Sequence, residues 1–159
     1  MKGWLLLLLP FLFSFKLLEV PFVKQKDDFC GPASLSSVLE YYDVKVSQED
    51  IAKVVYSPKL KGALITDLEN YAKSLGFKTT LFKGSLEDLK KYLDQNVPVI
   101  ILVDLGFLWV SKPHYLVVVG YDEENFYVHT GFESKKRVPY EELYKKWQKM
   151  GSVGLVIYK

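Results

Sequence analysis

Residues 25–35 read QKDDFCGPASL and contain Cys30, the single cysteine of this 159-residue chain. The apolar residues that follow keep the i, i+3, i+4, i+7 spacing of a helix: Leu35, Val38, Leu39 and Tyr42. Because Pro32 suits a first turn, the pattern predicts a helix from about Gly31 to Tyr42, with Cys30 at its N-terminus. The positive end of the helix dipole stabilises a thiolate, so we expect Cys30 to have a low pKa and a nucleophilic sulfur.

Gln25 precedes Cys30 by five residues and carries an amide that can donate a hydrogen bond beside the sulfur. Together with the backbone N–H of Cys30, it would supply two donors for an oxyanion, an arrangement that commonly contributes a few kcal/mol of transition-state stabilisation. The alternative is structural: Cys30 as a small buried apolar side chain and Gln25 as a surface amide.

A second stretch, KPHYLVVVGYD at residues 112–122, places His114 at the start of an apolar strand. A histidine on the rim of a sheet is rigidly held and still open to substrate, as a general base for a thiol must be. The alternative is an exposed imidazole without a partner. His129 is the other histidine of the chain and the other candidate for the base.

The remaining pattern indicates helices in the first half and a sheet in the second. Capping signals and periodicity predict further helices at residues 47–55, 66–76 and 85–94, and one within 138–149 that starts after Pro139. Runs of β-branched and aromatic residues predict strands at 97–105, 115–121, 126–130 and 153–158, with a hairpin loop at 122–125. This order predicts an α+β domain in which the cysteine helix lies against an antiparallel sheet.

Composition narrows the range of partners. The net charge is +2 and Arg137 is the single arginine, so a phosphate-binding surface for nucleic acid is not expected. One cysteine excludes an intramolecular disulfide and an all-cysteine metal site. Two histidines and scattered carboxylates lack a recognised ligand spacing, so we expect no metal and no organic cofactor.

The N-terminus reads MKGWLLLLLPFLFSF over residues 1–15, a lysine followed by an apolar run of signal-peptide length. We therefore expect residues 1–18 to be an export signal or membrane anchor, and residues 19–159 to be a domain in the periplasm or on the extracytoplasmic side of a membrane. A buried domain helix is disfavoured, because the run is apolar on every face and Pro10 would break it. No small-x-small cleavage site follows, which leaves an uncleaved interfacial anchor open.

The tract GFLWVSKPH, residues 106–114, lies between two predicted strands and places aromatic side chains next to the candidate base. It would line a groove for an extended peptide, or else pack into the core as an ordinary loop.

These stretches together resemble the papain-like cysteine peptidase domains that process double-glycine leader peptides in bacteriocin-exporting ABC transporters, and more closely their stand-alone exported relatives. The matching pieces are VPFVKQ (20–25), DFCGPASLSSVLEYY (28–42), HYLVVVGYD (114–122) and FYVHTG (126–131). The resemblance implies a papain-like fold for residues 20–159, with Gln25 in the oxyanion hole, Cys30 as nucleophile and His114 as base.

The resemblance also implies a third residue, an acid or amide at the end of the following strand, where this chain has Thr130 and Gly131. We expect the Thr130 hydroxyl to orient the imidazole, although it cannot stabilise an imidazolium as a carboxylate would. His129 should point to the opposite face by strand alternation. Asp122 and Asn125 belong to the hairpin loop, far from the start of the His114 strand.

The sequence therefore predicts a cysteine peptidase whose partner is a peptide or protein substrate. Two other functions fit the same residues: a peptide-binding module with little or no activity, favoured by the missing acidic residue, and an acyltransferase that passes the thioester to an amine. No GxxxxGK[ST] loop occurs in the chain, so ATP binding is not carried over from the transporters.

Overall fold

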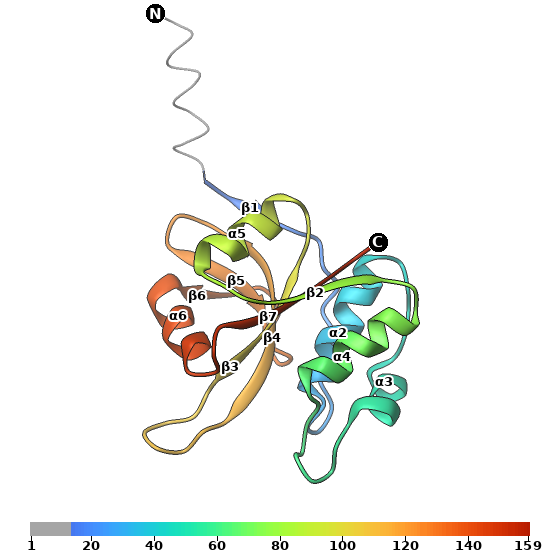
Figure 1. Cartoon of the computed structure of the whole chain (residues 1–159). Helices are drawn as coiled ribbons and strands as arrows, with labels where there is room; N and C mark the ends of the chain where they lie inside the picture. The colour runs from blue at the N-terminus through green and yellow to red at the C-terminus, as the bar shows by residue number, and fades with distance from the viewer. Residues whose placement is uncertain (1–13) are drawn as a thin grey trace, which may run out of the picture.

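The computed structural model describes residues 14–159, which form a group of helices beside an antiparallel sheet (Figure 1). Three helices lie on one side of the sheet: α2 (Cys30–Tyr41), α3 (Gln48–Val55) and α4 (Ile65–Ser74). Two more occur later in the chain, α5 (Leu86–Asp94) and α6 (Tyr140–Gln148). This arrangement confirms the predicted α+β class.

The sheet has the order β2-β7-β3-β4-β5-β6, and all neighbouring strands are antiparallel. The strands are β2 (Lys78–Lys83), β3 (Val99–Asp104), β4 (Pro113–Tyr121), β5 (Asn125–His129), β6 (Lys136–Pro139) and β7 (Val153–Tyr158). A short strand, β1 (Lys16–Leu17), pairs with β4 outside this order. Strand β4 is buried from its second residue to its last, and the active-site candidates are placed around its first residues.

Local signals fix several helix ends as predicted, although α4 begins at Ile65 without a side-chain cap and not at Thr66. The Ser47 side chain caps α3, and Ser85 opens α5 with a complete capping box. Gly76 follows α4 with a φ of +92°, a conformation that favours glycine at the C′ position. Helix α6 begins directly after Pro139.

Three strands were not predicted: β1, β2 and β6. Strands β1 and β6 have two and four residues, too few for a periodic signal. Strand β2 lies at the edge of the sheet, where lysines and threonines make up four of its six residues and every position is exposed or half-buried. None of the three carries the continuous apolar run that marks β3, β4 and β7.

Helix α2 is the central helix of the domain. Residues 31–39 are all buried, the serines included, because β4 packs against the helix from one side and α3 and α4 from others. The serines among them are satisfied locally: the Ser36 hydroxyl donates to the Val46 carbonyl at 2.7 Å, and Ser37 Oγ accepts from the Val23 N–H at 3.2 Å.

The N-terminal segment joins the sheet before the predicted domain boundary at residue 19. Lys16 and Leu17 pair with Tyr121 and Gly120 of β4, and the side chain of Leu18 is only 5% exposed. A side chain at Gly120 would come within 2.4 Å of the Lys16 carbonyl oxygen, so this close approach requires glycine. Most of the predicted export segment, residues 1–13, lies outside the described residues, and among residues 14–159 no helix is long and apolar enough to cross a membrane.

We predict that removing residues 1–18 destabilises the domain, whereas removing residues 1–13 does not. The first deletion discards β1 and the buried Leu18 side chain, and burying one leucine contributes roughly 2 kcal/mol. Urea unfolding of the two truncated chains measures the difference. Equal free energies of unfolding would show that β1 adds nothing to the stability of the sheet.

Candidate active site

Cys30 is the first residue of α2 and lies against the first residues of β4. The backbone N–H of Tyr115 lies near enough to the Cys30 sulfur to lower its pKa, and the Tyr115 ring covers the start of the helix. A Cβ at Gly31 would lie 3.2 Å from that ring, which explains the small residue after the cysteine. The Tyr115 hydroxyl donates to the Ala63 carbonyl at 2.7 Å and ties the α3–α4 loop to the same place.

Burial raises the pKa of the Cys30 thiol, and this is the largest influence on it. The backbone N–H groups of Tyr115, Gly31 and Cys30 itself act in the opposite direction, and the charge of Asp28 adds to the rise. The expectation of a low pKa at the helix N-terminus is therefore wrong. Desolvation of the sulfur outweighs the favourable dipole of α2.

His114, the second residue of β4, is only 5% exposed. Its Nε2 lies 2.6 Å from the backbone carbonyl oxygen of Thr130, an acceptor, so Nε2 carries the proton and donates it. The remaining ring nitrogen, Nδ1, is then free to accept a proton. Burial lowers the pKa of His114 more than the Thr130 hydrogen bond raises it, and the charge of Lys112 lowers it further.

The Phe132 ring stacks on the imidazole of His114, with the ring centroids 5.9 Å apart and an interplanar angle of 12°. The imidazole is therefore held at its edge by the Thr130 carbonyl and on one face by an aromatic ring. No spacing or periodicity in the sequence marks Phe132, because this contact depends on how the chain turns after β5.

Thr130 contacts the imidazole in a way that differs from the expectation. Its hydroxyl accepts hydrogen bonds from the backbone N–H groups of Phe132, at 3.1 Å, and Glu133, at 2.8 Å. The oxygen next to His114 is the backbone carbonyl, so the expected hydroxyl contact is wrong although the residue is the expected one. The hydroxyl instead closes the turn that carries both Phe132 and the carbonyl.

Gln25 lies beside the same turn. Its backbone N–H donates to the Gly131 carbonyl at 2.8 Å, and its Nε2 donates to the Asp27 carbonyl at 3.0 Å. Gly131 has a φ of +90°, and a Cβ there would lie 2.4 Å from Gln25 Oε1, so glycine is required on both counts. One N–H of the Gln25 amide remains available for a further acceptor, since an amide nitrogen carries two protons.

His129 serves the structure. Its Nδ1 accepts from the Lys135 N–H at 3.1 Å, so its Nε2 donates to the Val20 carbonyl at 2.8 Å. The ring also packs edge-on against Phe22. Both nitrogens are occupied, which removes His129 as an alternative base and shows that it fastens the N-terminal segment to β5.

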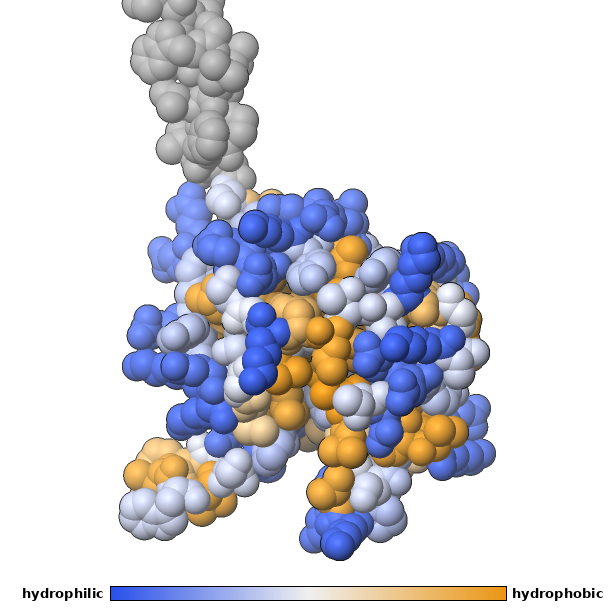
Figure 2. Space-filling view, in the orientation of Figure 1, coloured by the Kyte–Doolittle hydropathy of each residue, from blue (hydrophilic) through white to orange (hydrophobic). Residues whose placement is uncertain are grey.

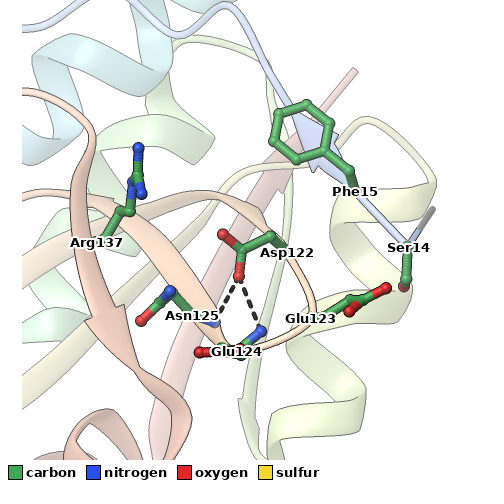
Figure 3. Close-up of a pocket in the computed structure, with 7 residues that line it drawn as sticks. All are labelled: Ser14, Phe15, Asp122, Glu123, Glu124, Asn125 and Arg137. Atoms are coloured by element: carbon green, nitrogen blue, oxygen red, sulfur yellow. Dashed lines mark hydrogen bonds between the residues drawn. The ribbon is translucent and has the colours of Figure 1, made fainter. Parts of the chain in front are cut away.

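The loop at residues 122–125 is remote from Cys30 and His114, as expected. It closes the far end of β4 and borders a cavity of about 420 Å³ that is also lined by Phe15 and Arg137 (Figure 3). Asp122 Oδ1 accepts from the backbone N–H groups of Glu124 and Asn125, as the dashed lines in Figure 3 mark. These bonds occupy Asp122 in the turn and leave it no role beside His114.

Residues 14–159 contain no group of three or more histidine, cysteine, aspartate or glutamate side chains placed to bind a metal ion. The described site itself offers a thiol, an imidazole with one free nitrogen, and N–H donors from Gln25 and the start of α2.

We predict that Thr130→Val loosens the turn that holds His114, whereas Thr130→Ser and Thr130→Asp preserve it. Valine cannot accept from the Phe132 and Glu133 amides, and losing such hydrogen bonds costs about 1–2 kcal/mol in the free energy of unfolding. Denaturation measures this loss, and ¹⁵N NMR of the imidazole reports its tautomer. A mixed tautomer in Thr130→Val alone is expected; identical spectra in all variants would contradict the assignment.

We predict that the domain loses stability as the pH falls below about 6.5, the ordinary histidine value. Burial lowers the pKa of both His114 and His129, so the unfolded chain takes up protons before the folded one does. Stability is complete above this pH and declines until the lowered pKa values are reached. Urea unfolding from pH 8 to pH 5 tests this, and a flat profile over that interval would contradict it.

The family of the chain follows from comparison with known proteins. Residues 17–155 match the model of the Peptidase_C39 like family. No curated protein matches the chain.

Solved structures with the same fold cover almost the whole chain. A candidate C39-like peptidase from Bacillus anthracis is 22% identical, with a TM-score of 0.75 over 92% of this chain and 98% of its own. The peptidase domain of Streptococcus ComA, a bifunctional ABC transporter involved in quorum sensing, is 25% identical, with a TM-score of 0.72 over 90% and 97%. A double glycine motif protease from an AMS/PCAT transporter, solved with its leader peptide, is 22% identical, with a TM-score of 0.74 over 90% and 94%. With its family model matched from residue 17 to residue 155, the chain belongs to the Peptidase_C39 like family.

Proposed function

We propose that this chain is a thiol-dependent peptidase in which Cys30 is the nucleophile and His114 the base. The observation that carries the proposal is that the Cys30 sulfur lies against the start of β4, where the Thr130 carbonyl fixes the tautomer of His114 and leaves Nδ1 unprotonated. A solved relative holds a leader peptide, which supports a peptide as the substrate.

In the resting enzyme both groups are neutral, because burial raises the pKa of Cys30 and lowers that of His114. The proton therefore moves during the attack: His114 Nδ1 takes it from the thiol as the sulfur bonds to the peptide carbonyl carbon. The Thr130 carbonyl stabilises the imidazolium that forms, through the hydrogen bond it already accepts from Nε2.

The carbonyl oxygen of the substrate becomes an oxyanion in this step. The backbone N–H of Cys30 and the second N–H of the Gln25 amide are the proposed donors to it. When the intermediate collapses, the C–N bond breaks and the departing amine takes the proton from His114. Water, deprotonated by the same imidazole, then hydrolyses the thioester and restores the thiol.

We predict that the wild-type chain cleaves peptides and that Cys30→Ala and His114→Ala lose this activity by about a thousandfold or more. A synthetic peptide library that includes double-glycine leader sequences, read by mass spectrometry, measures cleavage. His129→Gln is the matched control, since it replaces the histidine whose nitrogens are both occupied by structural bonds. Circular dichroism confirms that each variant is folded at the assay temperature.

Intact-mass measurement of the enzyme separates the alternatives. A thioester on Cys30 that passes to an added amine and not to water would assign an acyltransferase. Peptide binding without any covalent adduct would assign a binding module. The rate of iodoacetamide labelling reports the protonation state of Cys30 independently. Because its pKa is raised, we expect Cys30 to be alkylated more slowly at neutral pH than free cysteine.

A further inference from the structure

The loop between β3 and β4 exposes four consecutive large apolar side chains. Phe107 is 78% exposed, Leu108 69%, Trp109 89% and Val110 65%, and we call these residues the hairpin tip. Such a contiguous group is unusual on a protein surface and is typical of an interaction site. The fold of the domain does not account for it, because these side chains contribute almost nothing to the core.

The base of the hairpin is built to hold the tip outward. Asp104 Oδ1 accepts from the backbone N–H groups of Gly106, at 2.7 Å, and Lys112, at 2.8 Å, and the Leu105 N–H donates to the Lys112 carbonyl at 2.9 Å. These bonds occupy the Asp104 carboxylate. The hairpin tip therefore projects apolar side chains from a defined turn, without a carboxylate among them.

A second projection lies at the same end of the molecule, in the loop between α3 and α4. Here Leu60, 57% exposed, stands between the exposed residues Lys59 and Lys61, and we call these three residues the lysine tip. Ser57 and Gly62 exchange backbone hydrogen bonds of 2.8 and 3.3 Å and close its base. In the view of Figures 1 and 2 both tips point in the same direction, with open space between them.

Exposed lysines flank both tips, and the one carboxylate of the β3–β4 hairpin, Asp104, lies at its base. Lys59, Lys61 and Lys112 are exposed, and none of them forms an ion pair with another residue of the described chain. Apolar and aromatic side chains flanked by lysines are typical of surfaces that enter the interface of an anionic bilayer.

We propose that this end of the domain docks on an anionic lipid bilayer, with the hairpin tip inserted at the headgroup boundary and the lysines on lipid phosphates. The shape of the tip favours lipid over a peptide: each of its four side chains is 65% or more exposed, so they form a convex point and not the walls of a groove. Tryptophan is also favoured at this depth of a bilayer.

This docking surface is separate from the N-terminal segment. Strand β1 pairs with Gly120 and Tyr121 at one end of β4, whereas the hairpin tip precedes Pro113 at the other end. The docking itself does not depend on the proposed peptidase activity. If that activity is also present, the Cys30–His114 site would face the bilayer surface.

Fluorescence of Trp109 tests the proposal in the full chain. The chain has three tryptophans, of which Trp147 is fully buried, so a Trp4→Phe background leaves Trp109 as the responsive one. Vesicles of phosphatidylcholine and phosphatidylglycerol should shift its emission to the blue, and brominated lipid should quench it. Pure phosphatidylcholine should give a much weaker response that salt does not change, because the lysines then lack an anionic partner.

Leu108→Asp in the same background should weaken vesicle partitioning by roughly tenfold or more, since it removes apolar area and adds a repelling charge. Leu75→Asp, at an exposed leucine that follows α4, is the matched control and should bind as the parent does. An unshifted Trp109 spectrum with anionic vesicles, or equal losses in both variants, would overturn the proposal. A blue shift produced by a peptide without lipid would assign the hairpin tip to substrate binding and would also overturn it.

Discussion

The packing of helix α2 against the first residues of β4 is the contact on which the site depends. The Tyr115 ring lies over Gly31, its hydroxyl reaches the α3–α4 loop, and its backbone N–H reaches the Cys30 sulfur. Tyr115 thus sets the distance between α2 and β4 and satisfies a loop carbonyl. Because Tyr115 directly follows His114, it also brings the thiol close to the start of the strand that carries His114. A larger residue at position 31 would push the ring away and separate Cys30, the proposed nucleophile, from the strand that carries the proposed base.

Burial is the second constraint, and it sets the protonation state of the site. It raises the pKa of Cys30 and lowers the pKa of His114, so the two groups disfavour charge for the same reason. A neutral pair costs the fold less than a buried ion pair would. In the proposed mechanism, charge separation then waits until a substrate carbonyl is present to receive the electrons of the sulfur.

The turn after β5 replaces a side-chain acid with backbone groups. The Thr130 carbonyl orients the imidazole, the Thr130 hydroxyl holds the turn, and Phe132 covers the ring. A carbonyl dipole fixes the tautomer as a carboxylate does, but it stabilises an imidazolium less. The backbone N–H of Gln25 donates to the Gly131 carbonyl of the same turn, so one turn supports both the proposed base and the candidate oxyanion donor.

Much of the fold could be predicted from the sequence because its signals are local. The helix that contains Leu35 and Leu39, the strand that follows His114 and the caps at Ser47 and Ser85 are predicted from periodicity and from hydrogen bonds made within a few residues, with helix and strand ends shifted by one or two positions. The resemblance to leader-processing peptidases predicts Thr130 next to His114. The structure confirms this position, but the atom that contacts His114 is the Thr130 backbone carbonyl oxygen and not its hydroxyl.

The tertiary structure alone decided the remaining features, because each depends on residues far apart in the chain. The Cys30 pKa depends on how deeply the fold buries the sulfur. In this structure desolvation outweighs the dipole of α2, which the sequence could not show. The sequence alone places Leu17 and Leu18 at the end of an export segment. In the structure Leu17 pairs with Gly120, and the Leu18 N–H donates a hydrogen bond to the Val119 carbonyl. Long-range burial and backbone acceptors leave no periodic trace in a sequence, so only the folded chain fixes them.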